Sequence, residues 1–164
     1  MTNRADPKRI DSATRVIKAS QQTIYKACID PEAWLAWLPP KGMIGQIYEF
    51  DARNGGTYRM SLTYVEAEHA VHGKTTENTD VVQGRFLELV PDERIVQLVE
   101  FESNDPMFAG AMTMIWTFSA VPGGTEVSII CENVPEGIRQ EDHIVGLKSS
   151  LENLSIFVEK NRLG

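Results

Sequence analysis

The sequence predicts an α+β domain in which an antiparallel sheet packs against a long C-terminal helix. Two observations predict this fold class. From Met43 onward apolar and polar residues alternate, and the glycine-rich segments NGG (54–56) and PGG (122–124) interrupt the alternation as hairpin turns do. Near the C-terminus the period changes, and apolar residues recur every three or four positions, as on one face of a helix.

The length and composition are those of one globular domain. The 164 residues are enough for a sizeable core, and 42% of them are hydrophobic and 24% charged, unlike disordered or membrane-spanning chains. We expect a flexible N-terminal segment, residues 1–11, followed by a single domain over residues 12–164. The first eleven residues are polar, unlike a signal peptide, and no apolar run approaches the roughly 18 residues that span a membrane. The expected location is therefore the cytoplasm, with no membrane partner.

Charge and cysteine content exclude further classes of protein. The net charge is −7 and lysine and arginine do not cluster, which argues against a nucleic-acid partner. Cys28 and Cys131 lie in apolar patterns and form no CxxC motif. We expect both to be buried free thiols.

The N-terminal part predicts a strand followed by two short helices. Residues 13–19 alternate as a strand does, and Ser20 then stands as an N-cap before a helical segment. Asp30 is the N-cap of a second helix, because Pro31 suits the first helical position and the proline pair at 39–40 ends the helix.

Six further strands are predicted, joined by short turns as in an antiparallel meander. A longer polar segment, Glu66 to Asp80, has no period and is expected to form a lid or mobile loop. The six strands are Gly45 to Arg53, Thr57 to Val65, Asp80 to Val90, Arg94 to Ser103, Ala111 to Val121 and Thr125 to Asn133.

The last element is a helix over about Ile138 to Lys160. One flank of its apolar stripe carries small or polar residues, which indicate either close backbone approach or empty space beside the helix. The stripe consists of Ile144, Leu147, Leu151, Leu154 and Val158, and the flank of Arg139, His143, Gly146, Ser150 and, further on, Phe157.

This order of elements resembles the helix-grip fold. The stretches DPEAWLAWLPPKG (30–42), FDARNGGTYRM (50–60) and VPEGIRQEDHIVGLKSSLENLSIFVE (134–159) resemble the family named for activators of heat-shock-protein ATPase, within the START-like (SRPBCC) superfamily. The resemblance extends from about Arg15 to Glu159 and implies a curved sheet wrapped around the last helix, with a cavity between them. Gly146 and Leu147 stand where the family often has Gly-Trp, which either enlarges a pocket or repacks it.

The implied cavity suggests where a ligand would bind. Trp34 and Trp37 share one face of the second short helix, which in such a fold lies across one end of the cavity, so we expect them to act as lid and core together. Alternation in residues 57–64 and 112–118 places tyrosines, methionines and Trp116 on inner faces, as packed core or as pocket wall. The candidate ligand-binding residues are Trp37, Tyr58, Met60, Tyr64, Met112, Met114, Trp116, His143, Gly146 and Ser150.

The sequence offers little catalytic chemistry, and we assign no catalytic residue, metal ligand or cofactor. His69 and His72 lie near Glu66 and Glu68 but lack the i, i+4 spacing of a helical zinc site. His143 is the only other histidine, and its residue type suits an acid or a base, but no orienting carboxylate is visible in the sequence.

Three functions are compatible with these features. The favoured one is binding of a small apolar or aromatic molecule in the cavity. The alternatives are an enzyme of the polyketide-cyclase or dehydratase type, with His143 or a tyrosine as acid, and a protein-binding module that stimulates a chaperone's ATPase. A homodimer through the sheet edge or the helix is also compatible with the sequence.

Overall fold

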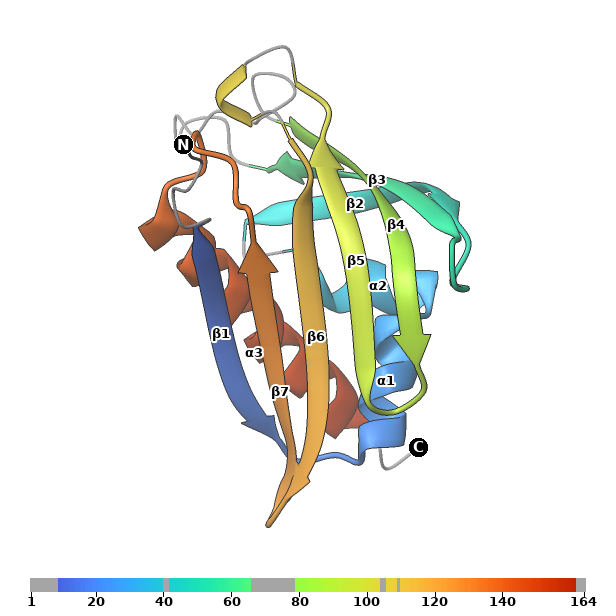
Figure 1. Ribbon diagram of the computed structural model, residues 1–164. Coiled ribbons are helices and arrows are strands. Elements are labelled where there is room, and N and C mark those ends of the chain that lie inside the picture. Colours follow the sequence, from blue (N-terminus) through green and yellow to red (C-terminus); the bar gives the residue numbers. More distant parts are fainter. Residues whose placement is uncertain (1–8, 40–41, 66–78, 104–105, 109, 162–164) are drawn as a thin grey trace, which may run out of the picture.

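The computed structural model describes residues 9–39, 42–65, 79–103, 106–108 and 110–161 (Figure 1). Seven antiparallel strands form one sheet in the order β1-β7-β6-β5-β4-β3-β2. The α+β class and all seven predicted strands are confirmed. The strands are β1 (Ile10–Ile17), β2 (Met43–Phe50), β3 (Thr57–Tyr64), β4 (Thr79–Val90), β5 (Arg94–Phe101), β6 (Met112–Val121) and β7 (Gly124–Glu132).

Three helices lie on one side of this sheet. They are α1 (Gln21–Cys28), α2 (Pro31–Trp37) and α3 (Gln140–Asn161), and a short 3-10 helix, η2, spans Pro106–Phe108. In Figure 1 α3 lies behind β1, β7 and β6, while α1 and α2 lie behind the other half of the sheet. Helices α1 and α2 also connect β1, at one edge, to β2, at the other. None of the helices within the described residues is long and apolar enough to cross a membrane.

The first strand begins earlier than predicted. It starts at Ile10 rather than at residue 13 and pairs with β7 from Ile10 opposite Glu132 to Ile17 opposite Thr125. The boundary expected after residue 11 therefore lies inside a strand, and residues 1–8 are outside the described part. The expectation missed this start because Asp11, a buried carboxylate, occupies an inward position where alternation calls for an apolar residue.

The two short helices begin where their caps predict. The Ser20 hydroxyl accepts a hydrogen bond from the Thr23 N–H at 3.1 Å, and the Asp30 carboxylate accepts one from the Glu32 N–H at 3.0 Å. These bonds satisfy amide groups that have no partner inside a helix. The segment 66–78, expected to be a lid, lies outside the described residues.

Two β-bulges bend the sheet around the helices. The register shifts between Ile47 and Glu49 on β2 and between Phe86 and Glu88 on β4. A bulge increases local twist and bends the strand that carries it. The hairpin turns contribute glycines with positive φ, +84° at Gly55 and +91° at Gly123, as the NGG and PGG segments predict.

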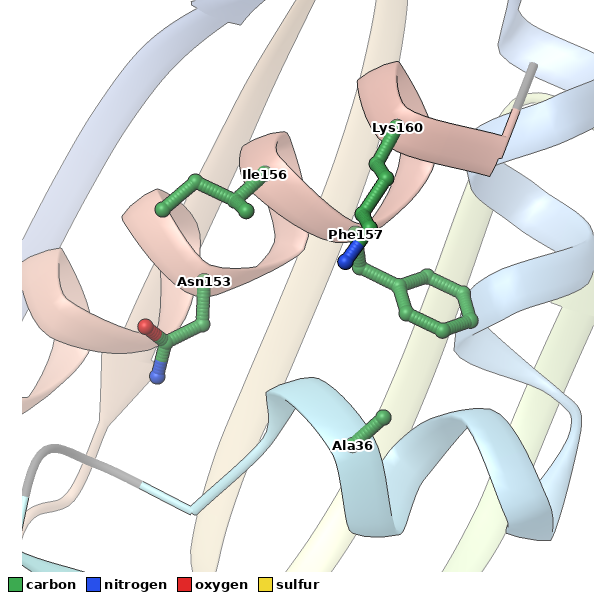
Figure 2. A pocket seen from close by; sticks show the side chains of 5 residues that line it. All are labelled: Ala36, Asn153, Ile156, Phe157 and Lys160. Atoms are coloured by element: carbon green, nitrogen blue, oxygen red, sulfur yellow. The ribbon is translucent and has the colours of Figure 1, made fainter. Parts of the chain in front are cut away.

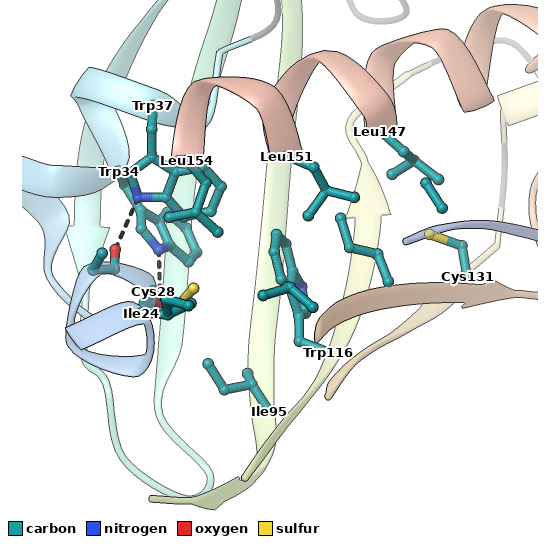
Figure 3. Packing of buried hydrophobic residues seen from close by; sticks show 14 of the residues in the cluster. Ile24, Cys28, Trp34, Trp37, Ile95, Trp116, Cys131, Leu147, Leu151 and Leu154 are labelled. Atoms are coloured by element: carbon teal, nitrogen blue, oxygen red, sulfur yellow. Dashed lines mark hydrogen bonds between the residues drawn. The ribbon is translucent and has the colours of Figure 1, made fainter. Parts of the chain in front are cut away.

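The core lies between the inner face of the sheet and α3. In Figure 3 three leucines of α3 point from the helix toward Ile95 and Trp116 on the sheet. The predicted stripe is buried except for Ile144, which is half-buried near the start of the helix. Both cysteines are buried free thiols, as predicted. The buried members of the stripe are Leu147, Leu151, Leu154 and Val158.

We expect Leu151→Ala to lower the free energy of unfolding by about 2–5 kcal/mol, because the side chain is 1% exposed and its removal leaves a cavity. Lys148→Ala, on the exposed side of the same helix, is expected to change it by less than about 0.5 kcal/mol. Urea denaturation of both variants measures the difference. Equal losses would show that α3 does not pack on the sheet through this stripe.

Candidate functional site

The ten predicted site residues divide into a packed group and a half-buried group. Four are half-buried: Tyr64 on β3, Met114 on β6, and His143 and Gly146 on α3. The other six are buried: Trp37, Tyr58, Met60, Met112, Trp116 and Ser150.

Aromatic rings fill the interior beside α2. The Trp37 and Trp116 rings lie edge to face with centroids 5.6 Å apart, and the Trp34 and Tyr58 rings do so at 5.0 Å. Tyr58 packs over Gly84 so closely that a Cβ there would overlap its ring. Burial also raises the pKa of Tyr58. This end of the interior is therefore solid core.

The indole N–H groups of α2 fasten this helix to α1. Trp34 donates to the Cys28 carbonyl at 2.7 Å, and Trp37 donates to the Ala27 carbonyl at 2.9 Å (Figure 3). Trp34 is 3% and Trp37 1% exposed, so each ring is packed in the core while its N–H is hydrogen-bonded. The sequence predicted that this pair acts as lid and core together, and both rings lie in the core.

The small residues on the flank of α3 serve two different purposes. The Ser150 hydroxyl donates to the Leu38 carbonyl at 2.8 Å, and the Asn153 amide donates to the Pro39 carbonyl at 3.1 Å. At these positions the helix closely approaches the end of α2. At Gly146, by contrast, a Cβ would meet no atom of the described residues within 4 Å. Close approach and open space, the two alternatives from the sequence, thus occur at different positions on one flank.

Met114 marks incomplete filling on the sheet side. It lies on the inner face of β6 between buried Met112 and buried Trp116. Its cross-strand partners, Gln97 and Cys131, are also buried, yet Met114 is only half-buried. Met114 packs against the core from one side and keeps exposed surface where no described residue covers it.

Tyr64 lies at the end of β3 and is linked electrostatically to the start of α3. Burial raises its pKa, and so do the negative charges of Asp80 on β4 and Asp142 in the first turn of α3. The phenol therefore stays protonated at neutral pH and can donate a hydrogen bond.

Asp11 on β1 joins the first turns of α3 to the sheet, and sequence reasoning missed it. Arg9 donates two hydrogen bonds to its carboxylate, at 3.1 and 2.7 Å. Gln140 donates a third at 3.0 Å, and His143 Nδ1 lies 2.7 Å from Oδ2. Burial by itself would raise the pKa of Asp11, but the hydrogen bonds from these partners and the charge of Arg9 lower it. One signal existed: an aspartate at an inward position of an alternating strand.

The sequence shows no carboxylate that would orient His143, but the structure places Asp11 beside it. Because the lowered pKa of Asp11 keeps its carboxylate ionised at neutral pH, the Nδ1–H of His143 donates to it. An oriented imidazole at the start of α3 is suited to hydrogen bonding or to proton transfer.

The described residues contain no cluster of three or more histidine, cysteine or acidic side chains that would hold a metal ion. His69 and His72 lie outside these residues. Burial and the nearby charge of Asp11 raise the pKa of Cys131 to about 12, and burial raises that of Cys28. Both are therefore thiols at neutral pH rather than nucleophilic thiolates.

Two surface hollows lie away from the half-buried group. One, of about 360 Å³, lies between α2 and α3, where the Phe157 ring faces Ala36 (Figure 2). The other, of about 310 Å³, lies over β2 to β5. Tyr58 contributes to the second, and no other predicted site residue lines either. The first is lined by Ala36, Asn153, Ile156, Phe157 and Lys160.

Known proteins share both sequence pattern and fold with this chain. The sequence profile of the family described as Activator of Hsp90 ATPase homolog 1-like protein matches residues 18–159. A crystal structure of a Chromobacterium violaceum protein is 33% identical, with 92% of this chain and 96% of that chain covered and a TM-score of 0.80. The solution structure of an AHSA1-like protein from Aeromonas hydrophila is 16% identical, covers 95% and 96%, and has a TM-score of 0.70. No curated protein matches the chain.

We expect Asp11→Asn to lower the free energy of unfolding at neutral pH by about 2–4 kcal/mol, because it removes the charge to which Arg9 and His143 donate. A carboxyl whose pKa is lowered on folding stabilises the protein above its unfolded pKa of about 3.9, and the contribution is lost as pH falls through the folded value. The wild-type advantage should therefore shrink below about pH 4.

Urea denaturation across this pH range measures the effect. Glu126→Gln, an exposed change on β7, is the control and should leave the acid limb unchanged. An Asp11→Asn protein with wild-type stability at neutral pH would contradict the role assigned to this carboxylate.

Proposed function

The chain belongs to the Activator of Hsp90 ATPase homolog 1-like family, and from this premise we propose that it binds a small apolar or aromatic molecule between the sheet and the N-terminal half of α3. Proteins of this START-like fold commonly bind hydrophobic ligands. Because one fold serves many functions, the proposal rests on the site rather than on the family alone.

The observation that carries the proposal is the contrast between the two ends of the interior. Beside α2, Trp37 and Trp116 pack against each other. Beside the first turns of α3, a Cβ at Gly146 would meet no described residue within 4 Å, and Met114 on the inner face of the sheet is only half-buried. An apolar wall with unfilled space next to it is the kind of surface that apolar ligands cover.

A few polar groups border this space and would orient a ligand. Tyr64 offers a hydroxyl donor and His143 an imidazole fixed by Asp11. Acidic groups, Asp80 and Asp142, act on the same tyrosine, so an anionic ligand would be repelled at this end. A cation would lose its hydration against the apolar wall at Met114, so a neutral molecule is favoured.

The packing also limits the role of Trp37, which the sequence suggested as a lid. Its ring is 1% exposed and its N–H is bonded within the core. In the proposed function, the half-buried residues Tyr64, Met114, His143 and Gly146 form the wall of the site, and buried residues of the sheet form its floor.

We expect Gly146→Phe to reduce binding of the neutral fluorescent probe N-phenylnaphthylamine about tenfold or more, because the ring would occupy the space that the ligand needs. Stability should not fall, since a new Cβ meets no neighbour among the described residues and phenylalanine favours a helix by roughly 0.5 kcal/mol over glycine. Fluorescence titration and thermal unfolding measure the two effects.

Val145→Phe is the matched control, since Val145 is 66% exposed on the neighbouring position of the same helix, and it should leave probe binding unchanged. A probe that binds wild type and Gly146→Phe equally would place binding elsewhere. Absence of probe binding to wild type would contradict the proposal and favour the chaperone-binding alternative.

A second candidate function, an acid–base enzyme of the dehydratase type, is favoured by the 2.7 Å contact between His143 and Asp11. An oriented imidazole beside an apolar site is the arrangement that removes a proton next to a carbonyl. Under this alternative the protein should dehydrate the aldol of benzaldehyde and acetone to benzalacetone. Ultraviolet absorbance measures the formation of this product. His143→Ala should abolish turnover and retain N-phenylnaphthylamine binding. No turnover by wild type above the buffer rate would contradict it.

A further inference from the structure

We propose that the ligand of this site is an uncharged molecule with a carbonyl or carboxamide group, which Trp116 and Gln97 bind on the floor of the site. This inference rests on the proposed function and adds the chemistry of the ligand's polar group. It comes from two polar side chains on neighbouring strands: Trp116, whose N–H is buried without a partner, and Gln97, which makes no side-chain hydrogen bond within the described part of the chain.

The first is the indole of Trp116 on β6. It is 4% exposed, and its Nε1–H is buried with no hydrogen-bond partner, the one such side-chain atom among the described residues. The other two tryptophans donate to backbone carbonyls of α1. An indole N–H can only donate, so its missing partner is an acceptor.

The second is the carboxamide of Gln97 on β5. Gln97 is 4% exposed and lies on the inner face between Ile95 and Val99, at 1% and 3% exposed. None of the side-chain hydrogen bonds within the described part of the chain involves it. Its amide atoms are not fully buried, because Trp116 Nε1 is the one buried side-chain atom without a partner among the described residues. Alternation would place valine, isoleucine or leucine at this inward position, so a glutamine that keeps accessible amide atoms there can offer them to a ligand.

The register brings these two groups together beside the unfilled space. Gln97 pairs with Met114, and Trp116 pairs with Ile95, so Gln97 and Trp116 are diagonal neighbours on one face of the sheet. Side chains in this relation lie about 7–8 Å apart at their bases and reach a common point when they are long. Met114, directly opposite Gln97, is the inner-face residue of β6 that keeps exposed surface.

The chemistry of the ligand follows from what these groups offer. A carbonyl oxygen has two lone pairs and can accept from the Trp116 N–H and the Gln97 amide together. The Gln97 oxygen is left to accept from a ligand N–H or O–H. No lysine or arginine is buried in the described part of the chain, so a carboxylate would enter this interior without a counter-charge. A neutral carbonyl compound fits.

The test compares acetylnaphthalene with ethylnaphthalene, which differ in the carbonyl group, by isothermal titration calorimetry. We expect wild type to bind the ketone more tightly. Trp116→Phe and Gln97→Leu should each reduce the ratio of the two affinities about three- to tenfold, the value of one hydrogen bond. The matched controls Trp34→Phe and Gln46→Leu, away from the diagonal pair, should keep the wild-type ratio.

The indole N–H signal of Trp116, recorded in wild type by NMR, gives a measurement that does not depend on a variant's folding. It should move downfield with acetylnaphthalene and not with ethylnaphthalene. Equal affinity for both compounds in wild type, or a ratio unchanged in both variants, would overturn this inference and leave the proposed function standing. Binding of neither compound would overturn both.

Discussion

One helix is too narrow to cover the whole inner face of a seven-stranded sheet, and the rest of the architecture follows from this constraint. Seven strands are roughly 29 Å across, whereas a helix with its side chains is about 10–12 Å wide. The sheet therefore has to curve, which the bulges on β2 and β4 allow, and other elements have to cover what α3 leaves bare. Helices α1 and α2 do this for one half of the inner face. We propose that the site lies on the part of the inner face that these two helices do not cover.

The two ends of α3 are held by different kinds of contact. Toward its C-terminal half, leucines pack on the sheet, and Ser150 and Asn153 bond to carbonyls at the end of α2. At its start, Gln140 and His143 bond to the Asp11 carboxylate on β1. A charged anchor at the first turns holds the helix in place without filling the space beside it with apolar side chains. The flank at Gly146 can then remain open while the fold stays stable.

Local sequence signals were sufficient for the elements and insufficient for the site. Caps such as Ser20 and Asp30 act within a few residues, and the stripe from Leu147 to Val158 is a periodic pattern, so both can be found without a structure. The pairing of Asp11 with His143 joins positions 132 apart, and only the fold brings them together.

The same limit explains the ambiguity at the small residues and at the core. Ser150 and Gly146 look alike in the sequence, and what distinguishes them is the α2 carbonyl that lies next to one and not the other. Alternation places Trp116 and Gln97 on the inner face but does not tell which polar atoms find partners there. A site of this kind forms where side chains leave space or a polar atom without a partner, and sequence patterns do not show where this happens.

We propose that the ligand binds at the start of α3, over Met114. Methionine methyl groups report on this contact directly, because Met112 is buried and Met114 is only half-buried on the same strand. We expect nuclear Overhauser effects between N-phenylnaphthylamine and the Met114 methyl group, with none to Ile156 in the groove between α2 and α3. Contacts to Ile156 without contacts to Met114 would contradict the account.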